Sequence, residues 1–438
     1  MYEVLENPES AVCAYLVGLK GPEDARASVE EHLDELRLLT GTMGLAVAGA
    51  EIVSLSRPTP DLLIGRGKAE AIAEQCRQQG ADCLIFDDDL SPTQQRNWEK
   101  LSDLCVIDRR EVILDIFAAR ARTQEARLQV RLAQLEYSLP RLRRAWTHLE
   151  RQRGGGGFRG GGGEHQLELD QRQARNEIAV IRRRLSEVRR RRDVQRRSRS
   201  AKPVPNAAIV GYTNAGKSTL LRALTGAETL VEDKLFATLD PLTRRLRLPG
   251  GRDMLVTDTV GFIRKLPHDL VEAFKATLEE TRLADFLIHV VDASHPGAAD
   301  QIAATNAVLR EIGAFDKPTI LALNKIDRLA DAAPVRALAE AAETPCLISA
   351  ETGEGLDGLL DALARLRLSE LEAVVMEVPA SRYDVVARIH REGDVLFESY
   401  AGESVWLEAR LPRRLAGQWR DLRREALPTD LLAAAGAL

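Results

Sequence analysis

The stretch Gly211–Thr219, GYTNAGKST, constrains the fold more than any other part of this chain. It has the spacing of a phosphate-binding loop, in which a glycine is followed after four residues by Gly-Lys-Ser. The apolar run Ala207–Val210 predicts a strand before the loop, and Leu220–Leu224 predicts the start of a helix after it. Backbone N–H groups and the helix dipole then favour an anion at one place. We therefore expect a P-loop domain of the α/β class with a mostly parallel sheet.

Each residue type in the loop has a place in phosphate chemistry. Gly211 and Gly216 let the backbone turn, Lys217 can reach the outer phosphates, and Ser218 can offer its hydroxyl to Mg²⁺. A chance glycine turn is the alternative, and the flanking strand and helix make it much the weaker one. The loop residues that we expect at the nucleotide are Gly211, Tyr212, Thr213, Asn214, Ala215, Gly216, Lys217, Ser218 and Thr219.

Three later stretches identify the base as guanine. Each one follows an apolar run that predicts a strand, and these runs are 254–256, 319–323 and 345–348. The Asp327 carboxylate can accept from the N1–H and N2–H₂ groups of guanine, a donor pair that adenine lacks. Asn324 can hold the guanine edge, the Lys325 stem can cover its ring, and a backbone N–H after Ser349 can meet O6. The residues assigned to the metal, terminal-phosphate and base side are Asp258, Thr259, Val260, Gly261, Asn324, Lys325, Ile326, Asp327, Ser349, Ala350 and Glu351.

Length and composition predict several globular domains. The chain has 438 residues, 45% of them hydrophobic and 29% charged, which allows a sizeable core. The five cysteines have no CxxC or metal-ligand spacing and indicate free thiols in a reducing compartment. The N-terminus has no apolar signal core, and no apolar run is long enough to span a membrane. We therefore expect a cytoplasmic protein.

The region Ala11–Arg110 predicts a small α/β domain, in which strand-like and helix-like patterns alternate. Gly65 and Gly67 form a lone GxG turn, for which a structural role outweighs a ligand role. The run Asp87–Asp89 is more typical of a solvated loop than of a cation site. The expected strands are 12–19, 45–55, 83–86 and 106–108, and the expected helices are 28–39, 69–79 and one beginning at Ser91-Pro92.

Two apolar seams predict an antiparallel helical pair. Pro140 is expected to kink the first helix. The first seam steps alternately by four and three residues, through Leu128, Leu132, Leu135, Leu139, Leu142, Trp146 and Leu149. A glycine-rich loop, Gly154–Gly163, precedes the second seam, which is Ala174, Ile178, Ile181, Leu185 and Val188.

Net charge is −5, yet the second helix is dense in arginine. We favour phosphate binding over a solvated face, and structured RNA over stacked single strands because aromatic residues are only 4%. The arginines are Arg182, Arg183, Arg184, Arg189, Arg190, Arg191, Arg192, Arg196, Arg197 and Arg199.

The stretches 90–97 (LSPTQQRN) and 115–126 (DIFAARARTQEA), the glycine-rich loop, Gln166–Glu168 and the P-loop together resemble the HflX family of ribosome-associated GTPases. The resemblance covers nearly the whole chain. It implies an N-terminal α/β domain (1–115), a helical hairpin with a glycine-rich tip (116–200), a GTPase domain (201–368) and a small α+β C-terminal domain (369–438). It also implies binding to the large ribosomal subunit and splitting of stalled ribosomes under heat stress. Where the family has Gly-Pro-Gly-Glu at the loop end, this chain has Gly161–Glu164, GGGE, which leaves the tip contact open.

The resemblance also assigns the switch. Thr229, Thr238 and Thr243 could each meet the Mg²⁺ ion and the terminal phosphate, and the family's Phe-Ala-Thr-Leu-Asp pattern selects Thr238. Residues Phe236, Ala237, Thr238, Leu239 and Asp240 are therefore expected at the nucleotide. We expect Lys217, Thr238 and Gly261 to be catalytic, with Ser218 and Thr238 as metal ligands.

Position 262 bears on the rate of hydrolysis. Many related GTPases place a glutamine there to orient the attacking water, whereas this chain has Phe262. Intrinsic hydrolysis should be slow and stimulated by a partner. In related GTPases an asparagine in the P-loop, here Asn214, with no such glutamine accompanies a K⁺ ion beside the phosphates, so K⁺ is a further expected ion.

After the GTPase domain, strands are expected over 374–380, 395–400 and 404–409, with helices over 384–390 and 411–422. The sequence thus predicts a monomeric, Mg²⁺-dependent GTPase that meets the large ribosomal subunit and its RNA through the arginine-rich hairpin and the N-terminal domain. A ribosome-assembly or regulatory GTPase scaffold without splitting activity remains an alternative, and so does an ATP-using RNA remodeller.

Overall fold

The computed structural model describes residues 12–145, 162–199, 204–226, 235–236, 238–264, 275–329, 333–369, 371–428 and 431. The chain divides into two compact units. The first comprises Met1–Arg190, Leu230–Pro241 and Val260–Glu279, and the second comprises Arg191–Thr229, Leu242–Thr259 and Glu280–Leu438. The predicted glycine-rich tip, apart from the helical Gly162 and Gly163, lies outside the described residues. The four predicted domain boundaries stay predictions.

The first unit contains a parallel four-stranded sheet in the order β2-β1-β3-β4. Every predicted strand of this region is present within three residues of its expected ends. The strands are short and mostly apolar because the central ones are buried on both faces. Their bounds are β1 Cys13–Lys20, β2 Ala46–Ser54, β3 Cys83–Phe86 and β4 Cys105–Asp108.

The three predicted helices of this region are present, and α3 begins at the predicted residue, whereas α1 and α2 begin two and three residues earlier than predicted. Ser91 caps α3 through its side chain, Gln94 returns a bond to the Ser91 N–H, and Pro92 occupies the first helical position. Gly65 is the N-cap of α2, so the predicted GxG turn starts a helix. The bounds are α1 Arg26–Thr42, α2 Arg66–Gln78, α3 Pro92–Ser102 and α4 Arg109–Arg120.

A buried ion pair fastens α4 to the sheet. Arg109 Nη1 donates to Asp87 Oδ1 at 2.7 Å, and Arg109 also pairs with Glu35 of α1. Arg109 and Asp87 are each 2% exposed. The prediction of a solvated loop is therefore wrong for Asp87, because the buried guanidinium needs a carboxylate partner. The described residues contain no cluster of His, Cys, Asp or Glu side chains that could hold a metal ion.

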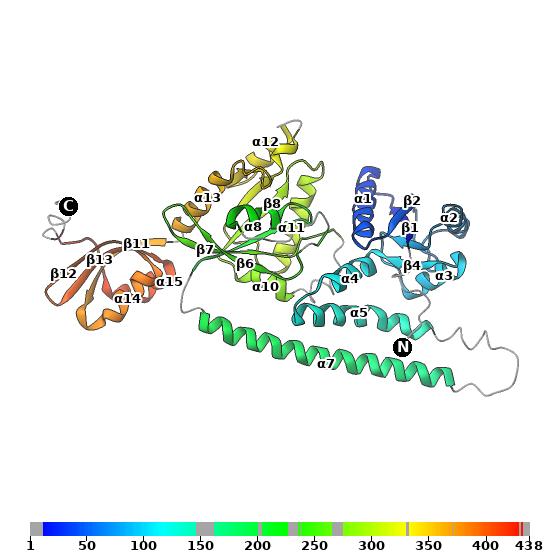
Figure 1. Cartoon of the computed structure of the whole chain (residues 1–438), viewed down its shortest axis with the longest axis horizontal. Helices are drawn as coiled ribbons and strands as arrows, with labels where there is room; N and C mark the ends of the chain where they lie inside the picture. The colour runs from blue at the N-terminus through cyan, green and yellow to red at the C-terminus, as the bar shows by residue number, and fades with distance from the viewer. Residues whose placement is uncertain are drawn as a thin grey trace. The chain divides into compact units, whose positions relative to one another are not determined.

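Two long helices, α5 (Gln124–Ala145) and α7 (Gly162–Arg199), form the predicted pair. Figure 1 shows them side by side and running in opposite directions. Leu128, Leu132, Leu135 and Leu139 pack against Ala174, Ile178, Ile181 and Leu185. Arg131 and Arg182 bond across the pair to Glu177 and Glu136. Pro140 lies inside α5, which continues to Ala145; the side chains of Leu142, Trp146 and Leu149 lie outside the described part.

A buried polar cluster joins α5 to the first sheet. Arg141 Nη2 donates to Leu90 O at 2.9 Å and to Asp108 Oδ2 at 3.3 Å, and its guanidinium lies 3.4 Å from the centroid of the Tyr137 ring. Tyr137 OH donates to Glu111 Oε2 at 3.1 Å. The C-terminal half of α5 is therefore held to the N-terminal sheet by hydrogen bonds.

The second unit contains a six-stranded sheet in the order β10-β9-β8-β5-β7-β6. All pairs are parallel except β6 with β7. This is the expected mostly parallel sheet, and the predicted strands 207–210, 254–256, 319–323 and 345–348 all lie in it. The bounds are β5 Asn206–Gly211, β6 Leu242–Arg247, β7 Asp253–Asp258, β8 Phe286–Asp292, β9 Thr319–Asn324 and β10 Pro345–Leu347.

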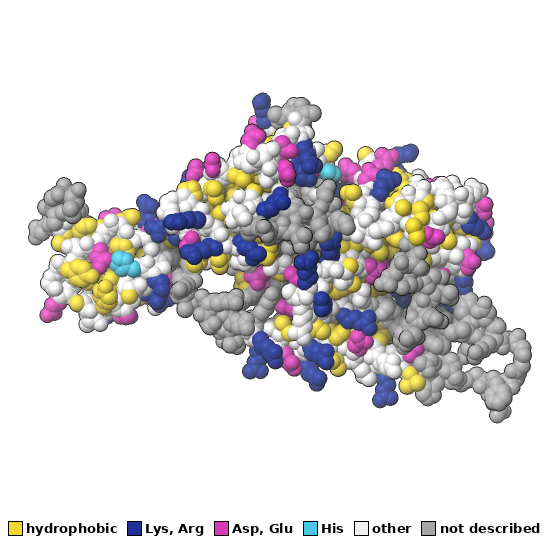
Figure 2. Space-filling model, viewed as in Figure 1, with side chains coloured by type: hydrophobic (Ala, Val, Ile, Leu, Met, Phe, Trp, Pro, Cys, Tyr) yellow, Lys and Arg dark blue, Asp and Glu magenta, His cyan; other side chains and the backbone are white. Residues whose placement is uncertain are grey.

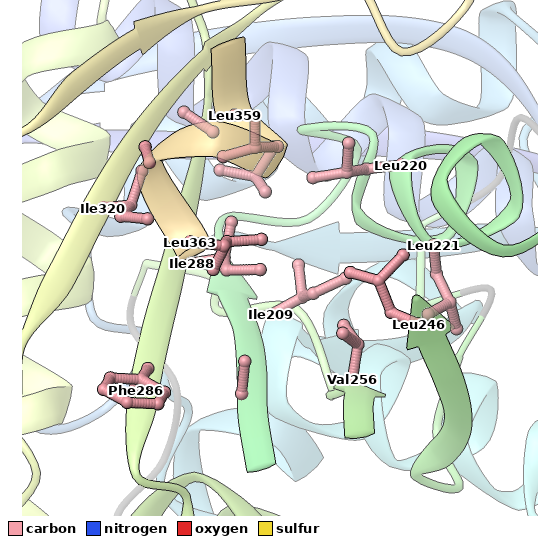
Figure 3. Close-up of a cluster of buried hydrophobic side chains, with 14 of the residues drawn as sticks. Ile209, Leu220, Leu221, Leu246, Val256, Phe286, Ile288, Ile320, Leu359 and Leu363 are labelled. Atoms are coloured by element: carbon pink, nitrogen blue, oxygen red, sulfur yellow. The ribbon is translucent and has the colours of Figure 1, made fainter. Parts of the chain in front are cut away.

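Helices cover both faces of this sheet. On one face, strand residues such as Ile209 and Ile288 share a core with Leu220 of α8 and Leu363 of α13 (Figure 3). On the other face, Val291 and Leu323 pack with residues of α11 and α12. Alternation along each strand thus fills two separate cores. The helix bounds are α8 Lys217–Thr225, α10 Lys275–Leu283, α11 Ala298–Glu311, η3 Ile326–Arg328, α12 Ala333–Glu340 and α13 Leu356–Ser369.

An antiparallel sheet, β12-β13-β11-β14, follows α13. The helix predicted over 411–422 is confirmed in part, since α15 spans Arg413–Gln418 and the 3-10 turn η5 spans Arg420–Leu422. Leu411 is instead fully buried in strand β13 and pairs with Glu372 of β11, so the strand runs through the predicted start of the helix. The bounds are β11 Leu371–Pro379, η4 Ala380–Arg382, α14 Tyr383–Glu392, β12 Asp394–Ala401, β13 Ser404–Pro412, α15 Arg413–Gln418, η5 Arg420–Leu422 and β14 Arg423–Arg424.

Two further expectations concern the chain as a whole. All five cysteines are free; Cys76 and Cys83 are buried, and the other three are partly exposed. Among the described helices, none combines the length and the apolar character that a membrane crossing requires.

Glu111 makes stability depend on pH. Burial chiefly, then the charges of Asp108 and Asp115, raise the pKa of Glu111 from 4.5 to about 7. Between these values the folded state holds a proton that the unfolded chain has lost, so the free energy of unfolding should fall as pH rises. Glu111→Gln should remove up to about 3 kcal/mol of this fall.

The measurement is urea unfolding of the full chain at pH 5 and pH 8, followed by hydrogen exchange in the β3–β4 peptides. The exposed Glu354→Gln variant is the control. An identical difference between pH 5 and pH 8 in wild type and Glu111→Gln would contradict the assignment.

Candidate guanine-nucleotide site

Two positions of the P-loop backbone can be occupied without strain only by glycine. Gly211 has φ +144°, and a Cβ there would lie 2.1 Å from the carbonyl oxygen of Val290. Gly216 has φ +94° and is the N-cap of α8. Asn214 also has a positive φ, +59°, a region that asparagine tolerates better than most residues. The loop therefore curls between the end of β5 and the first turn of α8, as its spacing predicts.

Lys217 is prepared for a phosphate partner. It is 7% exposed, and its Nζ donates to the Tyr212 carbonyl at 2.7 Å. Burial lowers the pKa of Lys217 to about 8, although Asp258 opposes that shift. Phosphate oxygens would stabilise the charged form. The hydroxyl of Thr213, itself buried, makes no hydrogen bond within the described residues, and a phosphate oxygen would satisfy it.

The expected metal side joins the first turn of α8 to the end of β7. Ser218 Oγ donates to Asp258 Oδ2 at 2.6 Å. Thr259 Oγ1 donates to the Ile209 carbonyl at 2.7 Å, which fixes the chain beyond Asp258 against β5. A hydroxyl and a carboxylate are hard oxygen donors that fit Mg²⁺, an ion that usually completes its shell with water and phosphate oxygens.

Asn324 connects the base side to the P-loop. Its Nδ2 donates to the Ala215 carbonyl at 2.8 Å, and its Oδ1 accepts from the Ala350 N–H at 2.9 Å. A Cβ on Gly216 would lie 2.3 Å from the same Nδ2. The side chain is 2% exposed, and its two bonds hold the P-loop, the end of β9 and the loop after β10 together.

Lys325 and Asp327 are positioned beside it. Lys325 has φ +66°, and its Nζ lies 2.7 Å from Asp292 Oδ2. Ser349 Oγ donates to Asp327 Oδ1 at 2.6 Å. Ile326 and Asp327 begin the short helix η3, whereas Glu351 is exposed. The structure thus brings the predicted base-side residues together at the carboxyl ends of β9 and β10.

The predicted switch residues belong to the first unit. Thr238 is half-buried, whereas Leu239, Val260 and Gly261 are buried. Phe236 packs on Phe117 of α4 with ring centroids 4.6 Å apart, and Asp240 accepts hydrogen bonds from residues Arg122 and Thr123. Ala237 and Thr229 lie outside the described residues.

Sequence reasoning missed several partners of the site. Asp292 holds Lys325, and its place at the end of the apolar run 286–291 was a usable signal. Phe117 and Thr123 contact the predicted switch from more than a hundred residues away in the chain, and no local pattern could identify them.

Asp327→Asn tests the base assignment. The amide can pair with the 2-oxo group of xanthine but cannot accept from the guanine N2 amine. GTP affinity should fall by about 3 kcal/mol, roughly a hundredfold, and xanthosine triphosphate affinity should rise. Fluorescence titration with both nucleotides measures this. Unchanged GTP affinity would show that Asp327 does not bind the base.

Comparisons with known proteins match most of the chain to GTPases. Three family models match in succession: "GTP-binding GTPase N-terminal" over residues 30–118, "GTP-binding GTPase Middle Region" over 120–199, and "50S ribosome-binding GTPase" over 206–325. The GTPase HflX of Akkermansia muciniphila is 47% identical over 425 residues, which cover 94% of this chain and 97% of that protein.

The GTPase HflX of Escherichia coli K12 is 44% identical, over 89% of this chain and 92% of that protein. A crystal structure of the protein SsGBP with GDP is similar at a TM-score of 0.48 and 26% identity, over 81% of this chain and 98% of that one. With this extent of identity, and with the P-loop and base-side residues gathered in one site, the chain belongs to the HflX family of GTPases.

Proposed function

We propose that this GTPase binds the large ribosomal subunit and its RNA through the helical pair α5–α7, and that its GTP form splits stalled ribosomes during stress. The observation that carries the proposal is an exposed arginine stripe on a stiff arm. Arg183, Arg184, Arg190 and Arg191 are exposed, and helical geometry turns them away from the apolar seam. Figure 2 shows Lys and Arg side chains along the described part of this pair.

The distribution of positive charge along the chain favours an RNA partner. The chain is mildly acidic, with a net charge of −5, so it is not a general polyanion binder. Positive charge concentrated on one helix face still neutralises phosphates locally and releases their counterions. The apolar seam and the Arg131–Glu177 pair stiffen the arm, so little conformational freedom is lost on binding.

The chain's own residues account for nucleotide binding and slow hydrolysis. In the proposal Lys217 and the P-loop amides hold the phosphates, Asp327 and Asn324 select guanine, and Ser218 with Thr238 would hold Mg²⁺. When bound, Mg²⁺ neutralises charge that develops on the phosphate oxygens. Phe262, 2% exposed, has no group to orient water, so a partner or a second cation should complete the site.

Neutralising the stripe tests the RNA contact. The triple variant Arg183→Gln, Arg184→Gln, Arg191→Gln keeps helix propensity and removes three charges. Its affinity for large subunits should fall, and the slope of log K against log salt should decrease by about 0.7–0.9 per lost phosphate contact. Arg336, Arg391 and Arg420, exposed in the second unit, changed to Gln form the matched control.

Sedimentation of ribosomes with the protein and a non-hydrolysable GTP analogue reads out both binding and splitting. Separated subunits would support splitting, and the stripe variant should separate fewer ribosomes into subunits. Co-sedimentation with one subunit without separation would instead support an assembly or regulatory role. Equal salt slopes for the stripe variant and wild type would show that the helical pair does not contact RNA.

A second prediction concerns the monovalent ion. Asn214 has the positive φ of an ordered P-loop residue, and the buried Phe262 cannot replace a catalytic glutamine. Hydrolysis should be faster in K⁺ than in Na⁺ at equal ionic strength, and Asn214→Ala should reduce the K⁺ rate to the Na⁺ rate. A phosphate-release assay measures both. Equal wild-type rates in the two salts would exclude a K⁺ role.

A further inference from the structure

The predicted switch is fastened to the junction between α4 and α5. This junction is the segment 117–123, from the end of α4 to the residue before α5. Phe236 and Asp240, two residues before and two after Thr238, each contact it. All of these residues belong to the first unit. The contacts bracket the threonine that we propose as the sensor of the terminal phosphate.

The Asp240 contact completes the N-terminus of α5. Asp240 Oδ2 accepts from the N–H groups of Arg122 and Thr123, each at 3.1 Å, and Asp240 Oδ1 accepts from the Thr123 hydroxyl at 2.6 Å. Thr123 Oγ1 in turn accepts from the Ala126 N–H at 3.2 Å. The Thr123 carbonyl accepts from the Arg127 N–H, so Thr123 is the N-cap of the helix.

This arrangement replaces a capping box. In that motif a Glu or Gln at the third helical position returns a bond to the N–H of the N-cap residue. Here that position is Ala126, which has no polar side chain. Asp240, 117 residues along the chain from Thr123, accepts that N–H instead. Its negative charge also lies at the positive end of the helix dipole. The first turn of α5 therefore depends on a residue of the predicted switch.

The Phe236 contact supplies the second anchor. Phe236 has φ +56°, a left-handed backbone conformation that is unfavourable for a bulky side chain. Its side chain is 3% exposed, and its ring meets Phe117, fully buried on α4, edge-on at 72°. Burial and the aromatic contact offset the backbone strain. The strain persists because the surrounding packing requires it.

A third contact ties the stretch after Gly261 to the same unit. Arg264 Nη1 lies 3.5 Å from Glu31 Oε2 and 3.3 Å from His32 Nε2, both on α1. Phe262 and Ile263 are 2% and 3% exposed. Both stretches that carry the predicted contacts to the terminal phosphate are therefore held by the N-terminal region.

We propose that the α4–α5 junction is an ordering and coupling element for Thr238, with Asp240 and Phe236 as positioning residues. Two anchors fix the backbone on either side of Thr238, so less entropy is lost when this residue meets a third phosphate. Because coupling between two sites is reciprocal, events along the helical pair should also change GTP affinity. The sequence predicts Asp240 as a nucleotide contact, whereas its carboxylate binds the residues just before the start of α5. This inference rests on the proposed role of Thr238.

Thr123→Val and Asp240→Asn test the coupling in the full chain. Each variant should weaken binding of a fluorescent non-hydrolysable GTP analogue by up to about fivefold, because the stability that one helix cap contributes sets the upper limit of the coupling. GDP affinity should change by less than about twofold, since GDP has no third phosphate to engage Thr238. The control Ser91→Ala removes the cap of α3, a helix outside the α4–α5 junction, and should change neither affinity.

Hydrogen exchange measures a quantity that should not depend on the nucleotide if the cap has only a structural role. In the wild type, the amides of Ala126 and Arg127 should be better protected with the GTP analogue than with GDP. In Thr123→Val this nucleotide dependence should disappear. Equal loss of both affinities, tighter binding of the analogue, or an unchanged nucleotide dependence in the variants would each overturn the proposal.

The Thr238→Ala variant distinguishes a failure of the coupling from a failure of the proposed role of Thr238. If Thr238→Ala leaves analogue affinity unchanged, the switch assignment in the proposed function is itself wrong. If Thr238→Ala weakens the analogue and Thr123→Val does not, only the coupling is wrong. Adding Thr123→Val to Thr238→Ala should produce no further loss of analogue affinity, because both changes then remove one shared effect.

Discussion

The two hydrogen bonds of the Asn324 side chain join the parts on which nucleotide binding depends. One bond reaches the P-loop at Ala215, and the other reaches the loop after β10 at Ala350. The residue ends β9, beside β8 in the middle of the sheet. Since the amide is buried, loss of either bond would leave a polar group unsatisfied. The phosphate side and the base side of the site therefore form one structure.

Glycine makes this connection possible. Gly216 can approach Asn324 only because it has no Cβ, and Gly211 approaches Val290 of β8 for the same reason. Parallel strands end at one edge of the sheet, so β5, β7, β9 and β10 present their loops together. The buried core under these strands, built from residues such as Ile209 and Ile288, keeps that edge rigid enough to hold a phosphate chain.

The helical pair of the first unit has both exposed positive charge and hydrogen bonds that fix the position of α5. The pair has an apolar seam on one side and exposed arginines on the other. In the C-terminal half of α5, Arg141 and Tyr137 bond to Asp108 and Glu111 and join the helix to the N-terminal sheet. At the start of the same helix, Asp240 caps α5 from the predicted switch.

The sequence by itself determined the P-loop, the strands that precede each nucleotide motif, the helical pair and the parallel sheets. These depend on residues a few positions apart, whose spacing fixes local conformation and the buried face. The structure decided the ends of elements whose residues are shared with a distant strand, as at Leu411, which pairs with Glu372. It also decided that Asp87 is buried with Arg109 and that Asp240 caps α5. Such partners lie far apart in the chain, and only the folded backbone brings their donors and acceptors within bonding distance.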